Sequence, residues 1–139
     1  MYPVEQEILV IDSDETARSL IEQTLLDQGF AVTAVADGHA ALRRVEAKPF
    51  ALVVAEIRLP GTLDGFATVR RARALRPMLK CLFTSRFAPG PPWSNAERDE
   101  FIAKPFHRRE LVGCVFELLE RDGAPSSAAA AEHLGYRYA

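Results

Sequence analysis

The sequence predicts an α/β domain built on a parallel sheet with helices on both faces. Short apolar runs alternate with segments that carry apolar residues at helical spacing, a pattern typical of strand–helix–strand units. The third apolar run, residues 52–55, is apolar on both faces, which indicates a central strand of a parallel sheet. Crossovers between parallel strands are short and right-handed, and this favours a doubly wound topology.

Three strands and two helices are expected in the first half of the chain. Residues 8–11 form a β-branched run between polar residues, as a buried strand does. Residues 14–28 have helical spacing, and Gly29 follows where a left-handed residue is favoured. After an alternating strand at 30–35, Asp37 is a suitable N-cap for the next helix.

The second half begins with a loop and continues the alternation. Residues 58–65 contain Pro-Gly and Asp-Gly pairs, which are typical of turns. A helix is expected from about Phe66 to Leu75, followed by a strand that ends at Phe83. A short strand at 101–103 and an amphipathic helix at 110–121 complete the predicted domain.

The crossover between the fourth and fifth strands departs from this pattern. Three prolines and a glycine within residues 89–92 exclude a regular helix at that point. We therefore expect a mostly irregular crossover, with at most one turn, capped by Ser94, over residues 96–99. Phe87 is expected to fold back over the sheet as part of the core, whereas Trp93 fits either a core position or an exposed contact site.

Composition restricts the function mainly by exclusion. The 139 residues, 48% of them hydrophobic, suffice for a single domain at 1–121, and the small, polar residues 122–139 predict a flexible tail. A net charge of −2 favours neither nucleic acid nor an anionic membrane. The sequence contains no apolar run long enough to span a membrane, and Cys81 and Cys114 are expected to be reduced core residues. Both observations indicate a cytoplasmic protein.

Two further patterns have ordinary structural explanations. A run of basic residues around the third helix is expected to be a solvated face, with partner docking as the alternative: Arg70, Arg71, Arg73, Arg76 and Lys80. The three histidines show no metal spacing, and no glycine-rich phosphate loop or nucleophile motif is present. The sequence therefore predicts no enzyme.

Polar side chains follow the carboxyl ends of the predicted strands, where ligands of doubly wound sheets bind. Carboxylates suit a hard cation such as Mg²⁺, and an ammonium with a hydroxyl suits phosphoryl oxygens. Both kinds of group are present at the four strand ends: Asp12, Ser13 and Asp14, then Glu56, then Thr84 and Ser85, and finally Lys104.

On these residues the chain resembles the receiver domain of two-component response regulators, over residues 6–121. Four motifs occur in the family's order: ILVIDSD at 8–14, VVAEIRLPG at 53–61, FTS at 83–85 and IAKPF at 102–106. The resemblance implies a flavodoxin-like, five-stranded parallel sheet of order 2-1-3-4-5. It also implies a Lys-Pro bond after the fifth strand that is commonly cis.

The resemblance also assigns roles to individual positions. Lys104 matches the lysine that contacts the acyl phosphate, and Thr84 matches the hydroxyl that turns toward it. Phe101 matches the aromatic residue whose rotamer reports that turn, and Asp12 matches an acidic residue that helps to hold Mg²⁺. From the residues alone, Thr84 fits a simple backbone contact equally well, and Phe101 fits a plain core position.

Several positions depart from the family pattern. Glu56 replaces the aspartate that accepts the phosphoryl group and reaches ~1.3 Å further. Ser13 replaces a second acidic residue, so at most a weak Mg²⁺ site is expected at Asp12 and Glu56, with no cofactor required. Asp14 is expected to begin the helix rather than replace that acid. Thr62 is one extra residue in the following loop, and the fourth helix of the family is largely missing.

These departures favour a stand-alone, atypical receiver that is not phosphorylated in the usual way. Glu56, expected to pair with Lys104, then imitates part of a phosphoryl charge, and the protein acts by contact with a histidine kinase or a downstream regulator. Two alternatives remain: a receiver that still accepts phosphate as a sink or relay, and a module from a larger sensor kinase or regulator. A homodimer is compatible with each.

Overall fold

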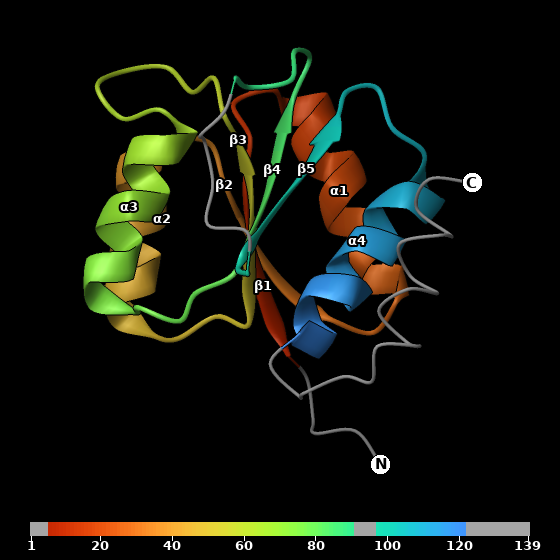
Figure 1. Ribbon diagram of the computed structural model, residues 1–139, viewed down its shortest axis with the longest axis horizontal. Helices are drawn as coiled ribbons and strands as arrows, with labels where there is room; N and C mark the ends of the chain where they lie inside the picture. Colours follow the sequence, from red (N-terminus) through yellow and green to blue (C-terminus); the bar gives the residue numbers. More distant parts are fainter. Residues whose placement is uncertain (1–5, 91–96, 122–139) are drawn as a thin grey trace.

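The computed structural model describes residues 6–90 and 97–121, which form a five-stranded parallel sheet (Figure 1). The strand order is β2-β1-β3-β4-β5, with every neighbouring pair parallel. This confirms the predicted fold class and topology. The strands are β1 (Glu7–Ile11), β2 (Ala31–Val35), β3 (Leu52–Glu56), β4 (Cys81–Ser85) and β5 (Asp99–Ala103).

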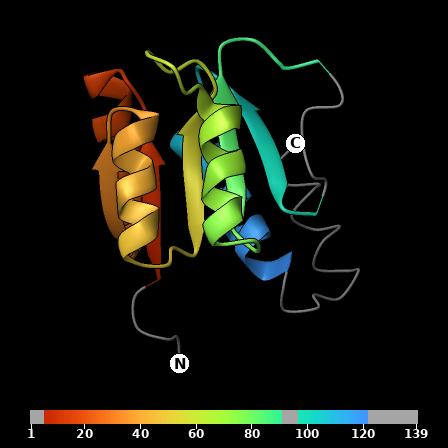
Figure 2. The ribbon, with the colours of Figure 1, turned by 90° about the vertical axis from the view of Figure 1, so that its left-hand side faces the viewer.

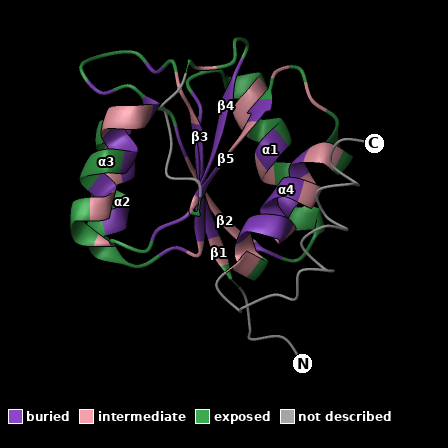
Figure 3. Cartoon of the chain, in the orientation of Figure 1, coloured by how far each residue is buried: buried purple, intermediate pink, exposed green. Residues whose placement is uncertain are grey.

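Four helices cover the two faces of the sheet. Helices α1 (Glu15–Asp27) and α4 (Arg108–Glu120) lie on one face, and α2 (Gly38–Ala47) and α3 (Gly65–Leu75) lie on the other (Figure 1). Each face has its own apolar core, because successive strand side chains point to opposite sides. The central strands β1, β3 and β4 and the inner faces of the helices are accordingly buried, the edge strands β2 and β5 are mostly half-buried, and the outer helix faces are exposed (Figure 3).

Aspartates begin three of the helices. Asp14, Asp37 and Asp64 each accept a hydrogen bond from the backbone N–H three residues later, at 2.8 Å in every case. Such a bond satisfies one of the free N–H groups of the first turn. The predicted N-caps Asp14 and Asp37 are confirmed, and Gly29 has the positive φ, 96°, expected after α1.

The described parts of the fourth crossover, residues 86–90 and 97–98, contain no helix, in agreement with the sequence. The turn expected over residues 96–99 does not extend to Asp99, because Asp99 is the first residue of β5 and pairs with Cys81 of β4. Ser94 and Trp93 lie outside the described residues, as does the tail 122–139.

In Figure 2, α2 and α3 lie in front of the sheet, and β5 lies beyond α3.

Two predictions about burial are wrong. Phe87 does not join the core: its side chain is 65% exposed, and the Arg58 guanidinium lies 5.8 Å from its ring centroid. Lys80 is not on a solvated face, since it is only 4% exposed and its ammonium donates to the backbone carbonyls of Leu118 and Leu119. These carbonyls lie at the C-terminal end of α4, where a cation is stabilised.

Two further expectations, about the cysteines and the Lys104–Pro105 bond, hold in the described part of the chain. Cys81 and Cys114 are buried and form no disulfide. The bond between Lys104 and Pro105 is cis. Within residues 6–90 and 97–121, none of the helices has the length and apolar character needed to cross a membrane.

Candidate functional site

The sheet register brings the predicted site residues together at the carboxyl ends of the strands. Glu56, the last residue of β3, is paired with Thr84 of β4. Asp12 follows β1 directly, and its backbone N–H donates to Val35 at the end of β2. Lys104 follows β5 and is anchored by its own N–H, which donates to the Ser85 carbonyl. Asp12, Glu56 and Lys104 thus meet at one edge of the sheet, and Thr84 lies beside Glu56 in the strand register.

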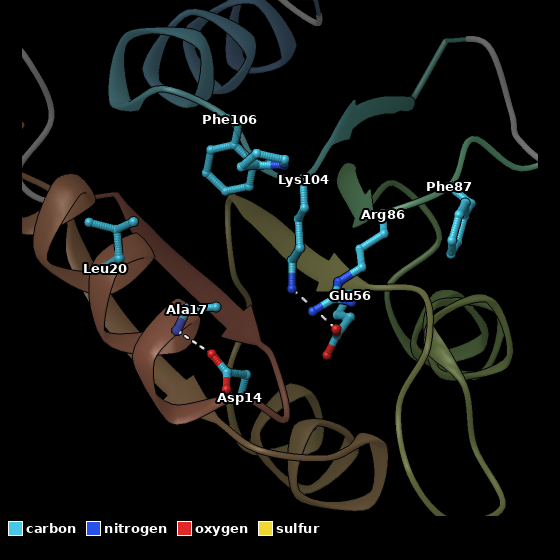
Figure 4. Close-up of a pocket in the computed structure, with 9 residues that line it drawn as sticks. Asp14, Ala17, Leu20, Glu56, Arg86, Phe87, Lys104 and Phe106 are labelled. Atoms are coloured by element: carbon cyan, nitrogen blue, oxygen red, sulfur yellow. Dashed lines mark hydrogen bonds and ion pairs between the residues drawn. The ribbon is translucent and has the colours of Figure 1, made fainter.

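Lys104 joins the two carboxylates of the site. Its Nζ lies 2.8 Å from Oδ2 of Asp12. The same Nζ lies 3.1 Å from Oε2 of Glu56 (Figure 4). The expected ion pair between Glu56 and Lys104 is thus present, and Asp12 shares the same ammonium. The Asp12 side chain is completely buried, and those of Lys104 and Glu56 are 16% and 15% exposed.

Ser13 holds the other oxygen of Glu56. Its backbone N–H and its hydroxyl both donate to Oε1, at 3.1 and 3.0 Å. The sequence identified Ser13 only as the loss of an acid, and these two hydrogen bonds were not predicted. The signal in the sequence is the longer side chain of Glu56, because it carries the carboxylate as far as Ser13, just before α1. A carboxylate at position 13 would instead repel Glu56 at this distance.

Every carboxylate oxygen of Asp12 and Glu56 consequently has a protein donor. Oδ1 of Asp12 accepts the Asp14 N–H at 2.9 Å, and Oδ2 accepts Lys104. Oε1 of Glu56 accepts Ser13, and Oε2 accepts Lys104. We call this arrangement of Asp12, Ser13, Glu56 and Lys104 the Glu56 clamp.

The pKa shifts follow from burial and from these contacts. Burial raises the pKa of Asp12, and the hydrogen bond from Lys104 only partly offsets it. Burial acts in the same direction on Glu56, but the hydrogen bonds from Ser13 and the Lys104 ammonium outweigh it and lower the pKa. Burial opposes the charge of Lys104, yet the two carboxylates raise its pKa. Glu56 and Lys104 therefore stay charged at neutral pH.

The remaining site residues have distinct environments. Thr84 is completely buried, and its hydroxyl has no hydrogen-bond partner among the described residues, so the simple backbone contact is wrong. Phe101 is half-buried and packs against the core on the α2–α3 face. The Asp14 carboxylate caps α1 through Ala17 and does not replace the acid missing at position 13.

The protein's own donors compete with a metal ion for the weak Mg²⁺ site expected at Asp12 and Glu56. Magnesium needs oxygen ligands with free lone pairs in near-octahedral geometry, and it is usually bound through one or two carboxylates. Here the carboxylate oxygens already accept protein hydrogen bonds, and the Lys104 ammonium lies between them. In the described part of the chain, no three His, Cys, Asp or Glu side chains are grouped to hold a metal ion.

Gly65 allows α3 to begin against the end of β3, and we predict that Gly65→Ala destabilises the protein. A Cβ at this position would lie 2.3 Å from the Glu56 carbonyl oxygen and 2.9 Å from Cα of Ile57. Both are backbone atoms, so α3 or the strand end must shift, at a cost of about 1–3 kcal/mol. Urea unfolding measures the loss. Gly90→Ala, where no atom lies within 4 Å of a new Cβ, is the control and should change little.

Comparison with known proteins gives the same fold. The family model for the response regulator receiver domain matches residues 8–116. The chain is 35% identical to the response regulator receiver protein CpdR of Brucella abortus, over 81% of this chain and 95% of CpdR. A receiver domain protein from Methanospirillum hungatei, described as CheY-like, superposes with a TM-score of 0.77 at 28% identity, over 87% of this chain and 99% of that one.

Longer regulators match over only part of their length. The transcriptional regulatory protein DctD of Rhizobium meliloti is 35% identical over 76% of this chain, but the match spans only 23% of DctD. The match therefore covers only a receiver-sized part of DctD, and it says nothing about the activity of the rest of that protein. The sheet order, the strand-end residues and the matched family model lead to one conclusion: this chain belongs to the response regulator receiver domain family.

Proposed function

We propose that this receiver domain acts without phosphorylation, through contact with a protein partner in two-component signalling. The observation that supports this most directly is the Glu56 clamp. The carboxylate at the acceptor position already has hydrogen bonds on both oxygens, from Ser13 and Lys104. These three hydrogen bonds use three of the roughly four lone-pair sites of the carboxylate and fix its orientation, so a phosphoryl donor would meet an acceptor that is largely engaged.

Glu56 places a permanent negative charge where a phosphoryl group would lie. Lys104, the residue that contacts the acyl phosphate in the family, is bound to Glu56 in the unmodified protein. The lowered pKa of Glu56 keeps this charge at neutral pH. The imitation is partial, because a carboxylate carries one negative charge and a phosphoryl group carries nearly two.

The partner that fits this role is a histidine kinase or a downstream regulator in the cytoplasm. Receiver domains generally work as signalling modules rather than as enzymes, and the relatives include CpdR, which is itself a receiver protein. A fixed charge at Glu56 makes the contact independent of a phosphate signal.

Replacing Glu56 with glutamine removes the charge with little change in shape, so Glu56→Gln should weaken partner binding.

The direct test is incubation with Mg²⁺ and acetyl phosphate followed by intact mass spectrometry. We expect no phosphoryl adduct on the native chain, because the clamp blocks both the acceptor and the metal. Ser13→Asp combined with Glu56→Asp shortens the acceptor and restores an acid, so this double variant serves as the positive control. An adduct on the native chain that disappears in Glu56→Ala would overturn the proposal and favour a phosphate sink or relay.

A further inference from the structure

A pocket of about 660 Å³ lies directly above the Glu56 clamp. Three segments form its walls: the first turns of α1, the chain after β4, and the chain after β5 (Figure 4). Its volume lies within the range of about 300–1,000 Å³ typical of small-molecule sites. The lining residues are Asp14, Ala17, Leu20, Glu56, Arg86, Phe87, Lys104, Pro105 and Phe106.

Apolar side chains form most of the pocket wall, and several of them are exposed. Leu20 on α1 is 41% exposed and Phe87 after β4 is 65% exposed. Phe106 and Pro105 complete the wall from the segment before α4. Phe87 is available to this pocket because the described chain after β4 does not turn into a helix at this point. An occupant would therefore remove exposed aromatic and aliphatic surface from water, which favours an apolar body.

The polar groups of the pocket have spare donors. Arg86 has five N–H groups and makes no hydrogen bond or ion pair within the described residues. Lys104 has three N–H groups, of which Asp12 and Glu56 take two. The Glu56 oxygens, in contrast, already accept three hydrogen bonds.

The formal charges of the lining residues cancel, since Asp14 and Glu56 balance Arg86 and Lys104, and the buried Asp12 carboxylate lies behind Lys104. Hydrogen-bonding capacity, and not net charge, then decides the chemistry of the occupant. Spare donors match a ligand with oxygen acceptors, and a planar guanidinium binds a carboxylate through two parallel hydrogen bonds. Arg86 comes from the side of the pocket opposite Asp14, and its side chain extends toward Glu56, whose oxygens already accept hydrogen bonds from Ser13 and Lys104 (Figure 4).

We propose that this pocket binds a small amphipathic carboxylic acid. The carboxylate pairs with Arg86, and the apolar body packs against Leu20, Phe87 and Phe106. The bound molecule would cover Glu56 and Lys104, so it would control access of a protein partner to the clamp. This binding does not depend on whether Glu56 is phosphorylated, and the proposal therefore extends beyond the proposed function.

Three matched probes test the proposal by isothermal titration calorimetry with the full chain: 1-naphthoate, the neutral 1-naphthalenemethanol and the cationic 1-naphthylmethylammonium. We expect saturable binding of the naphthoate and an affinity at least about tenfold lower for the neutral probe, as a charge-assisted hydrogen bond implies. The cationic probe should bind most weakly. Equal affinities, a preference for the cation, or no saturable binding of the acid would overturn the proposal.

Two pairs of variants locate the binding. Arg86→Gln should weaken naphthoate at least about tenfold and leave the neutral probe unchanged. Arg43→Gln, at an exposed position of α2, is its control. Leu20→Ser should weaken both probes, whereas Leu26→Ser, at a similarly exposed leucine of α1 (42%) outside the pocket lining, should weaken neither.

The same loss in Arg43→Gln, or in Leu26→Ser, would show that the probe binds elsewhere and would contradict the site. None of these outcomes affects the phosphorylation test above. The two proposals can therefore fail separately.

Discussion

Replacing Lys104 with methionine is expected to destabilise the folded protein by about 3–5 kcal/mol at neutral pH. Methionine keeps much of the side-chain length and removes the ammonium. The completely buried Asp12 carboxylate then loses its cation, and Glu56 loses the bond to Oε2. Breaking a buried ion pair from one side is costly because an uncompensated charge stays in a low-dielectric environment. Urea unfolding at several pH values measures the effect.

The loss should shrink as the pH falls. Burial already raises the pKa of Asp12, and removal of Lys104 raises it further. Between the unfolded and folded pKa values of Asp12, the folded state binds more protons than the unfolded state. Stability of the variant therefore decreases as the pH rises through that interval and recovers when Asp12 is protonated. The second substitution Asp12→Asn should restore part of the lost stability at neutral pH, because it removes the buried charge.

A surface ion pair supplies the control. Lys48 lies 2.8 Å from Glu7, a distance similar to that between Lys104 and Asp12, but the Lys48 side chain is 48% exposed. Lys48→Met should cost at most about 1 kcal/mol. If Lys104→Met costs no more than Lys48→Met, the clamp does not depend on the ammonium, and the account of the site is wrong.

The sequence was sufficient for the fold because strands and caps leave strong local patterns. The β-branched run of β1 is typical of a buried strand, and the run of β3, which is apolar on both faces, is typical of a central strand in a parallel sheet. Asp14 and Asp37 begin helices by contacts within three residues, which a local pattern can express. The pairing of Glu56 with Lys104 was also predictable, since both follow strand ends that meet at one edge of the sheet.

The errors concern contacts between segments far apart in the chain. Lys80 belongs to a basic run, and only the approach of the α4 terminus gives its ammonium two carbonyl partners in the interior. Ser13 is 43 residues from Glu56, so its donor role could not be read from either position alone. Phe87 was expected to fold back over the sheet in place of the missing helix, whereas the structure exposes it beside Arg58.

Loss of the Arg73 side chain should destabilise the protein by a similar amount, about 3–5 kcal/mol. Two guanidinium nitrogens of Arg73 lie 2.5 and 3.4 Å from the carboxylate of Asp99, the first residue of β5. The side chain of Asp99 is only 3% exposed. Arg73 also donates from Nε to the Leu79 carbonyl, so Arg73→Met removes an additional hydrogen bond. Thermal and urea unfolding measure the loss.

Arg71→Met is the matched control, because Arg71 lies on the same helix and is exposed. Its effect should stay within about 0.5 kcal/mol. A double-mutant cycle with Asp99→Asn separates the pair from the rest of the network, and we expect a coupling of about 0.5–3 kcal/mol between two residues in direct contact. A coupling near zero would show that Asp99 does not depend on Arg73.

The position of this pair makes the prediction relevant to the site. In the described sheet, β5 is the last strand and pairs with β4, and arginines from both faces contact its first residues. Arg73 approaches from the α2–α3 face, and Arg121, after α4, contacts the Asp99 carbonyl and Glu100. The other end of the same strand leads directly to Lys104. If β5 depends on Arg73, hydrogen exchange of the β5 amides should accelerate in Arg73→Met. Exchange of the Lys104 amide, which donates to the Ser85 carbonyl, should accelerate as well. Faster exchange confined to α3 would instead mean that the arginine stabilises its own helix and not the strand that carries the lysine.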